Sequence, residues 1–378
     1  MNFEYSEEQV LLKESIQRWL QDNYSFEQRH VIAASEQGFS SEHWTSFAEL
    51  GWLSVPFSEQ FGGYGGSIVD VAAIMQEFGN ALILEPLVPS VIMFGGLLEQ
   101  VADEKANNDL IPQIIDGSLL GAVAMYEPHT RFDMSNIACL ATADGDNFLL
   151  TGTKSMVLGG AHANKIIVLA RTSGEQSDEQ GISLFIVDSD AAGVQKGVYT
   201  LMDGQQVADL ELNKASGVLL GELNKGFAPL QAMMQNTHVA LSAEAVGIME
   251  KLNQTTLEYT KTRKQFGVTI SSFQALQHRM VDTFMSQEQV KSLLVGTLCE
   301  LSDESTSSQY AAKLINGLRT LVAKNGKHIG DEAIQLHGGM GLTDELDVGH
   351  YVKRLMIINL VFGNKDFFQN QFNQVAYS

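Results

Sequence analysis

The strongest constraint on the fold is the helical periodicity that runs without a strand-like interruption over residues 226–378. Apolar residues recur there at helical spacing in four long segments, Phe227–Thr262, Ser272–Leu301, Ser307–Leu336 and His350–Phe372. Each such helix must bury one apolar stripe, and four helices in succession can bury their stripes against one another. The pattern therefore predicts a C-terminal four-helix bundle over residues 226–378.

A strand-like pattern precedes this helical region. Between residues 121 and 225 the sequence has short apolar runs at Phe148–Thr151, Lys165–Ala170, Ile182–Val187 and Val207–Leu212. Asp-Gly, Ser-Gly and Asn-Lys turns separate them at short intervals, which is typical of antiparallel strands rather than of βαβ units. We expect a middle antiparallel β domain over residues 121–225.

Residues 1–120 return to helical spacing. An amphipathic helix is predicted over residues 6–23, where Ser6 and Gln9 form a capping box, and further helices at Ser41–Leu50 and Ile68–Gly79. No Gly-x-Gly-x-x-Gly sequence links a strand to a helix, so the Rossmann pattern is missing. The fold class is therefore α+β, with an N-terminal α-helical domain over residues 1–120.

Composition excludes several classes of partner. The 378 residues carry a formal net charge of -21, which argues against binding to nucleic acid or to an anionic membrane surface. The apolar stretch Ala81–Val101 contains Glu85, Pro86 and Pro89, so it predicts a loop and a buried helix rather than a membrane span.

The termini and the metal-ligating residue types add two expectations. The first eight residues show neither a signal peptide nor a transit peptide, which indicates a cytoplasmic protein. Cys139 and Cys299 have no redox or metal-like spacing, and His278, His328 and His350 are too scattered to predict a metal site.

Two segments at helix ends carry the functional signal, Arg263-Lys-Gln-Phe-Gly267 and Gln335-Leu-His-Gly-Gly-Met-Gly341. Together with the helix–strand–helix order, the loop Pro56–Gly66 and the dipeptide Glu127-Pro128, they give a chain that resembles the acyl-CoA dehydrogenase family along nearly its whole length. The resemblance implies FAD as cofactor, an acyl-CoA substrate and a role in fatty acid metabolism. It also implies electron-transfer flavoprotein as electron acceptor, and an oligomer in which FAD lies across a dimer interface.

The chemistry of the two segments agrees with that implication. The candidate cofactor-binding residues are Arg263, Gln265, Phe266, Gln274, Gln335, Gly338 and Gly339. A guanidinium can engage pyrophosphate oxygens bidentately, the glutamines add neutral donors, and the phenylalanine offers an aromatic face to flavin or adenine. The two glycines allow the backbone to approach the ADP half of the cofactor, where any Cβ would collide.

The elements that would hold the flavin ring depart from the family pattern. In Tyr126–Asp133, Glu127 matches the pattern, but Arg131 and Phe132 replace small residues. After Lys154 the family has Trp-Ile followed by Thr or Ser, and this chain has Met156-Val-Leu158 instead.

The base that removes the α-proton of the substrate is also missing from its usual place. The register from the glycine segment puts Phe362 at the family's glutamate, and a second acidic position used by some members falls on Thr237. Glu244 lies seven residues after Thr237 and so on about the same helical face, where burial could suit it to act as a base. Glu244 is therefore the candidate catalytic residue.

Three hypotheses follow from this mixture of matches and departures. The preferred one is a half-site or non-catalytic subunit of a heteromeric acyl-CoA dehydrogenase, which lends ADP-side contacts to the FAD of a homologous partner. The sequence resembles the small subunit of pimeloyl-CoA dehydrogenases in particular. The alternatives are a self-sufficient homo-oligomer with a displaced base such as Glu244, and a scaffold subunit that does not contact flavin.

Overall fold

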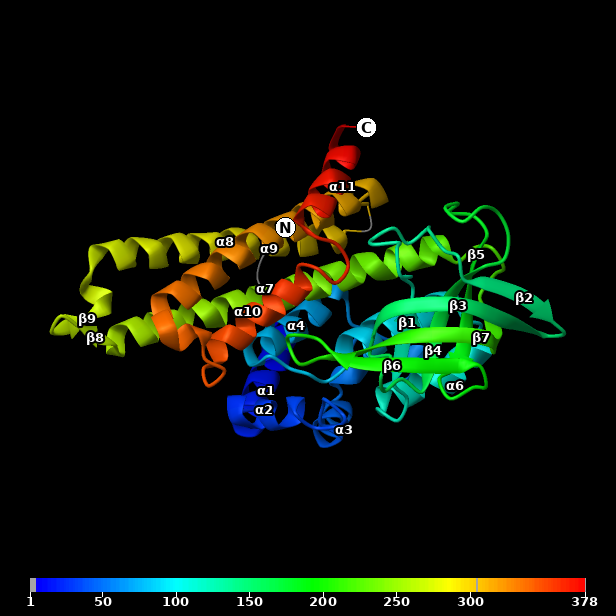
Figure 1. Cartoon of the computed structure of the whole chain (residues 1–378), viewed down its shortest axis with the longest axis horizontal. Coiled ribbons are helices and arrows are strands. Elements are labelled where there is room, and N and C mark those ends of the chain that lie inside the picture. Colours follow the sequence, from blue (N-terminus) through cyan, green and yellow to red (C-terminus); the bar gives the residue numbers. More distant parts are fainter. Residues whose placement is uncertain (1–4, 304, 378) are drawn as a thin grey trace. The chain divides into compact units, whose positions relative to one another are not determined.

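The structure of the chain, a computed structural model, describes residues 5–303 and 305–377. It contains two compact units, each assembled from separate parts of the sequence. The first unit comprises Met1–Val31, Ile68–Ile83 and His238–Ser378, and the second comprises Ile32–Ser67 and Leu84–Thr237. Figure 1 labels their elements in chain order.

The first unit is helical and contains most of the C-terminal region. Its elements are α1 (Glu7–Asn23), α2 (Phe26–Ala33), α4 (Ile68–Ala81), α7 (Phe227–Thr262), β8 (Lys264–Gln265), β9 (Val268–Thr269), α8 (Gln274–Leu301), α9 (Ser308–His337), α10 (Asp347–Ile358) and α11 (Lys365–Tyr377). The last two residues of α2 and the first turns of α7 belong to the second unit. The capping box predicted at Ser6 and Gln9 is present, with both reciprocal hydrogen bonds formed. The predicted C-terminal helical domain is confirmed.

The prediction of one helix over His350–Phe372 was wrong, because this stretch contains two helices. Between α10 and α11 the chain leaves the helical conformation, and Gly363 has a φ of 143°. Asn364 then caps the next helix, since its side chain accepts a hydrogen bond from the backbone N–H of Phe367 at 2.9 Å. Phe362 therefore lies in a turn between helices rather than on a helix face.

Two glycines allow α4 and α7 to cross at close range. A Cβ placed on Gly247 would lie 1.9 Å from the backbone oxygen of Gln76, and one on Gly79 would lie 2.1 Å from the backbone oxygen of Glu244. Any larger residue at either position would force the helices apart. This crossing positions Glu244 in the interior of the first unit.

The second unit combines short helices with one sheet. Its helices are α3 (Ser41–Glu49), α5 (Gly96–Val101), α6 (Glu104–Ile115), two 3₁₀ turns (Trp52–Ser54 and Glu59–Phe61) and a π-helical segment (Leu87–Gly95). Every residue of Leu87–Gly95 is buried, as predicted for this apolar stretch. No helix among the described residues is long and apolar enough to cross a membrane.

The sheet of the second unit is mostly antiparallel. Its strands are β1 (Gly121–Ala124), β2 (Leu140–Asp144), β3 (Asn147–Leu158), β4 (Lys165–Arg171), β5 (Ile182–Asp188), β6 (Val194–Thr200) and β7 (Gln206–Leu220). The four predicted runs lie in β3, β4, β5 and β7, whereas β1, β2 and β6 were not predicted. The expectation of antiparallel pairing holds for most strands, but β4 pairs in parallel with β1 and, at Leu140 and Arg171, with β2.

The strand pairings close on themselves. The sheet runs β1-β4-β2-β3-β7-β5, and β5 pairs back onto β4 over seven residues. The strands β4, β2, β3, β7 and β5 therefore form a ring, with β6 added outside on β7. Buried side chains such as Leu150, Val168 and Phe185 lie on one face of this ring.

Candidate functional site

The arginine segment forms a two-stranded hairpin at the end of α7. Strand β8 pairs with β9, and Phe266 and Gly267 make the turn with φ values of 54° and 83°. Two consecutive positive φ values define a type I′ turn, which is costly for a phenylalanine. Phe266 is 91% exposed and contacts Phe273 edge-to-face, with ring centroids 6.2 Å apart. A strained and exposed aromatic residue is typical of a surface that contacts another molecule.

The polar candidates of this segment surround the hairpin. Arg263, Gln265 and Gln274 are exposed, and no side-chain hydrogen bond or ion pair links any of them to another described residue. Gln274 is the first residue of α8, so the partial positive charge of that helix N-terminus is added to the charge of the guanidinium. These groups suit the pyrophosphate of a dinucleotide.

The glycine segment ends α9 in a conformation that requires glycine. Gly338 has φ 62° and ψ -142°, and its N–H donates to the backbone oxygen of Gln335. A Cβ built on Gly338 or Gly339 would meet no atom within 4 Å, so both residues border open space. Their missing side chains therefore leave room for a ligand rather than for packing within the chain.

One contact joins the two segments. The Tyr259 ring, one turn before Arg263, stacks on the His337 ring with centroids 4.3 Å apart, and the Tyr259 hydroxyl donates to the His337 backbone oxygen at 3.3 Å. His337 Nδ1 faces the backbone oxygen of Ala333 at 2.8 Å. The structure thus brings the arginine and glycine segments together through residues that the sequence analysis did not assign. The two segments together provide a cation, amide donors, an aromatic face and two glycines that border open space. These groups fit the ADP half of FAD.

The elements expected beside the flavin ring lie in the second unit. Glu127 and Lys154 form a buried ion pair with 2.7 Å between Oε1 and Nζ, and Glu127 also accepts the backbone N–H groups of Ala138 and Cys139. Burial raises the pKa of the Cys139 thiol. The Glu127 carboxylate and the Lys154 ammonium are therefore both engaged, which favours a structural role for this ion pair.

Strand β3 bulges where the family places its aromatic residue. The pairing of β3 with β7 shifts between Lys154 and Val157, and Met156 in the bulge has a φ of 52°. Its N–H donates to the Asp209 carboxylate at 2.8 Å. The chain therefore keeps an irregular strand at this position but places a flexible thioether on it.

The position expected for the base is apolar. Phe362 is 3% exposed and contacts the His238 ring with centroids 6.4 Å apart. Burial first, and then the charge of Arg319, lower the pKa of His238 well below 6.5, so this imidazole is neutral at neutral pH. Thr237 is buried as well, and its hydroxyl donates to the Met233 backbone oxygen. Neither expected acidic position offers a carboxylate.

Glu244 is buried, but both of its oxygens are engaged. Arg354 donates to them from Nε at 2.6 Å and from its terminal nitrogen at 2.8 Å, and both side chains are shielded from solvent. Such a fork-shaped pair is among the strongest charge-assisted contacts in proteins. Glu244 as a base stays a prediction, and this geometry favours a structural role for it.

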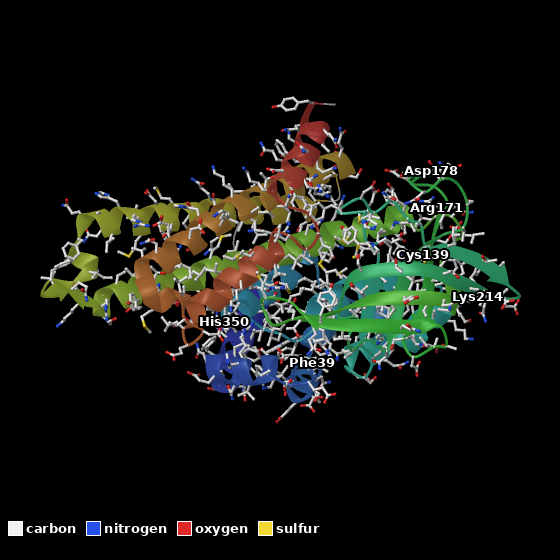
Figure 2. All side chains as sticks on the ribbon, viewed as in Figure 1. Phe39, Cys139, Arg171, Asp178, Lys214 and His350 are labelled. Atoms are coloured by element: carbon white, nitrogen blue, oxygen red, sulfur yellow. The ribbon has the colours of Figure 1, made fainter. Side chains whose placement is uncertain are left out.

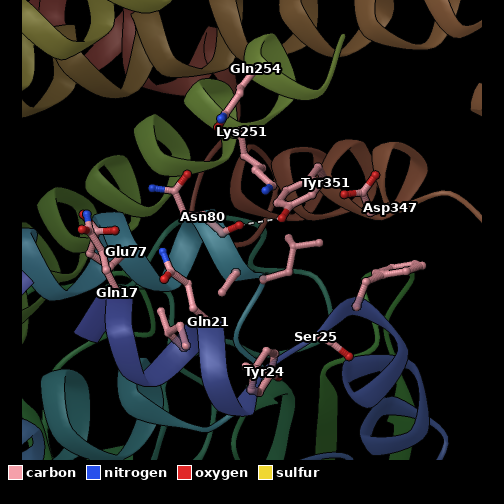
Figure 3. Close-up of a pocket in the computed structure, with 14 residues that line it drawn as sticks. Gln17, Gln21, Tyr24, Ser25, Glu77, Asn80, Lys251, Gln254, Asp347 and Tyr351 are labelled. Carbon is pink, nitrogen blue, oxygen red and sulfur yellow. Dashed lines mark hydrogen bonds between the residues drawn. The ribbon is translucent and has the colours of Figure 1, made fainter. Parts of the chain in front are cut away.

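A polar pocket of about 530 Å³ lies in the first unit. Its polar lining includes Gln17, Glu77, Asn80 and Lys251, and the Tyr351 hydroxyl donates to the Asn80 backbone oxygen at 2.5 Å at its edge (Figure 3). The sequence analysis did not identify this pocket, because its lining residues come from five separate helices, α1, α2, α4, α7 and α10.

Comparison with known proteins agrees with the architecture. The family models of the acyl-CoA dehydrogenase N-terminal, middle and C-terminal domains match residues 6–118, 122–215 and 224–376. The probable acyl-CoA dehydrogenase YngJ of Bacillus subtilis (strain 168) is 27% identical, with 97% of each chain covered.

Solved structures share the fold. The FAD complex of PigA superimposes with a TM-score of 0.90 at 23% identity, over 99% of this chain and 98% of that one. The ChsE4-ChsE5 complex from Mycobacterium tuberculosis gives a TM-score of 0.89 at 22% identity, with both chains fully covered. The chain therefore belongs to the acyl-CoA dehydrogenase family, whose cofactor is FAD.

Proposed function

We propose that this chain is a half-site or non-catalytic subunit of an FAD-dependent acyl-CoA dehydrogenase. It holds the ADP half of an FAD whose flavin ring and catalytic base belong to a homologous partner subunit. The observation that carries the proposal is the contrast between the exposed segments around Phe266 and Gly338, which border open space, and the buried Phe362 at the position expected for the base. The resemblance of the sequence to the small subunit of pimeloyl-CoA dehydrogenases supports the same role.

The reaction itself explains why the contrast matters. Dehydrogenation of an acyl-CoA between Cα and Cβ needs a carboxylate that takes the α-proton, and bound FAD supplies the hydride acceptor. Phe362 has no group that can accept a proton. Arg263 would neutralise pyrophosphate charge, Gln265 and Gln274 would donate to its oxygens, and Gly338 would let the backbone approach the nucleotide.

A heteromeric assembly has a precedent in the fold. The ChsE4-ChsE5 structure, which shares this architecture, is a complex of two proteins, ChsE4 and ChsE5. In such an assembly this chain would contribute one surface of the cofactor site, and the partner would pass electrons to electron-transfer flavoprotein. The acyl-CoA substrate would then be bound mainly by the partner.

The alternative is a self-sufficient homo-oligomer in which Glu244 acts as the base. The bidentate contact with Arg354 weighs against it, because the carboxylate would have to leave both hydrogen bonds to reach a substrate. A scaffold without flavin is disfavoured by the open glycines and by Arg263 at the end of α7, whose side chain is exposed and forms no ion pair with another described residue.

Flavin content separates these possibilities. The chain is purified alone and together with a co-expressed homologue that carries an intact glutamate, and visible spectra give the FAD per chain. We expect little flavin on the chain alone and one FAD per pair of chains in the complex, with loss of FAD from the complex when Arg263→Ala is introduced. About one FAD per chain in the isolated protein, bleached by an acyl-CoA, would exclude the half-site role.

A further inference from the structure

Three residues far apart in the sequence meet on the first unit. One ring nitrogen of His30, one of His350 and one carboxylate oxygen of Asp344 all lie within 4.8 Å of one another. His30 belongs to α2, Asp344 lies in the turn after the glycine segment, and His350 is on α10 and is labelled in Figure 2. The sequence analysis considered His350 with His278 and His328 and missed this group, because only folding brings α2 to α10.

The group has a defined geometry. His350 Nε2 lies 3.2 Å from the Asp344 carboxylate, and the rings of His30 and His350 have centroids 6.0 Å apart. The ring of Phe26, one turn before His30, contacts the His350 ring edge-to-face at 5.0 Å. Phe26 also lines the polar pocket. The buried His350 ring thus contacts the Phe26 ring as well as the exposed His30 and Asp344.

We propose that His30, Asp344 and His350 form a site for a divalent transition-metal ion of the Zn²⁺ type. Imidazole nitrogens with one carboxylate oxygen select Zn²⁺, Co²⁺ or Ni²⁺ over Mg²⁺ and Ca²⁺, which prefer all-oxygen ligands. Two ligand atoms on a tetrahedral Zn²⁺ lie about 3.4 Å apart, so the group must tighten by up to about 1.4 Å. The exposed His30 side chain and the turn carrying Asp344 can provide this movement.

Lys353 occupies part of the same space. Its ammonium lies 3.1 Å from Asp344 Oδ1, so a bound cation would displace it toward solvent, and the side chain of Lys353 is 41% exposed. Removing this charge should therefore tighten metal binding. If the ion pair between Lys353 and Asp344 has only a structural role, its removal should give no gain in affinity for any metal ion.

The experiment measures Zn²⁺ binding to the full chain after treatment with EDTA. Isothermal titration calorimetry should find about one Zn²⁺ per chain and no comparable binding of Mg²⁺. His30→Ala and His350→Ala should each weaken the affinity roughly tenfold or more, and Lys353→Met should strengthen it. His328→Ala, on the exposed face of α9, is the matched control and should bind Zn²⁺ like the parent chain.

Co²⁺ provides an independent readout of the ligands. A site of two nitrogens and one carboxylate should give weak visible bands without the intense near-ultraviolet absorption of a cobalt–thiolate bond, which excludes Cys139 and Cys299. Circular dichroism confirms that each variant is folded, and the exposed His30 makes His30→Ala the decisive variant. Absence of Zn²⁺ binding, or unchanged binding in His30→Ala, overturns the proposal.

Discussion

At the scale of single residues, the Glu244–Arg354 pair decides between two roles for the one buried carboxylate proposed as a base. A structural pair predicts that Glu244→Gln lowers the free energy of unfolding by about 3–5 kcal/mol, because it removes the charge paired with the buried Arg354 guanidinium. Chemical denaturation measures this loss. The double variant Glu244→Leu with Arg354→Leu should recover part of it, since both paired charges are removed, but the buried Arg319 then loses the nearby charge of Glu244.

The Glu244→Gln variant distinguishes the structural role of Glu244 from a catalytic one, because the two roles predict different results. If Glu244 acts as the base, Glu244→Gln should abolish turnover in the assembled enzyme while leaving stability nearly unchanged. The structural reading would be contradicted by that result. Flavin content of the same assemblies shows whether any loss of activity comes from loss of the cofactor.

His238 predicts a pH dependence of stability. Its pKa is lowered in the folded state, so between its folded pKa and about 6.5 the unfolded chain binds more protons and stability falls as the pH falls. Nδ1 of this ring is buried with no hydrogen-bond partner among the described residues, which supports the neutral form. His238→Leu should therefore lose less stability than the parent chain between pH 7 and about pH 5, as measured by urea denaturation. Equal pH slopes for both proteins would contradict this assignment.

At the scale of elements, the helix crossing of α4 and α7 makes a sharp prediction. Gly247→Ala would place a methyl group 1.9 Å from the Gln76 backbone oxygen, so the helices must separate, at a cost of at least about 1–3 kcal/mol. The matched control is Gly296→Ala in α8, where an added Cβ meets no atom within 4 Å and helix propensity favours alanine by up to about 1 kcal/mol. Thermal unfolding should therefore shift in opposite directions in the two variants.

The same scale shows what periodicity can and cannot predict. The bounds of α7 are those that the helical spacing predicts, because a 36-residue helix repeats its apolar stripe many times. The break between α10 and α11 was missed because apolar residues continue across it, although Gly363 and Asn364 carry the local signal for a turn and a cap. Strands β1, β2 and β6 were missed because each is short or largely exposed.

At the scale of the whole molecule, the exposed hairpin around Phe266 makes a prediction about assembly. Phe266→Gly removes the strain of a positive φ, so the isolated chain should be as stable as the parent or slightly more stable. The same change removes the aromatic face offered to the cofactor, so the complex with a homologous partner should retain less FAD. Tyr377→Ala, which removes an exposed aromatic residue from α11, is the control and should leave the flavin content unchanged. Undiminished flavin in the Phe266→Gly complex would exclude this residue from the cofactor surface.

The candidate site could be predicted only in part from the sequence. Contiguous segments such as Arg263–Gly267 and Gln335–Gly341 keep their chemistry in a short stretch of chain, so their residues could be identified directly. Contacts between residues far apart in the chain leave no comparable pattern in the sequence. The stacking of Tyr259 on His337 and the meeting of His30 with His350 depend on packing among helices, which no local pattern records.

The closed ring of strands has a consequence for solubility before any partner is met. A sheet with open edges can pair with another chain and start aggregation, but β4, β2, β3, β7 and β5 satisfy much of one another's backbone hydrogen bonding. Among the described strands of this sheet, β1 and β6 pair on one side only, with β4 and β7 respectively. All four residues of β1 are buried, and β6 carries Lys196 and Gly197 in its middle. A charged side chain and a glycine discourage the addition of a further strand there. A sheet protected in this way is less prone to pair with the sheets of other molecules.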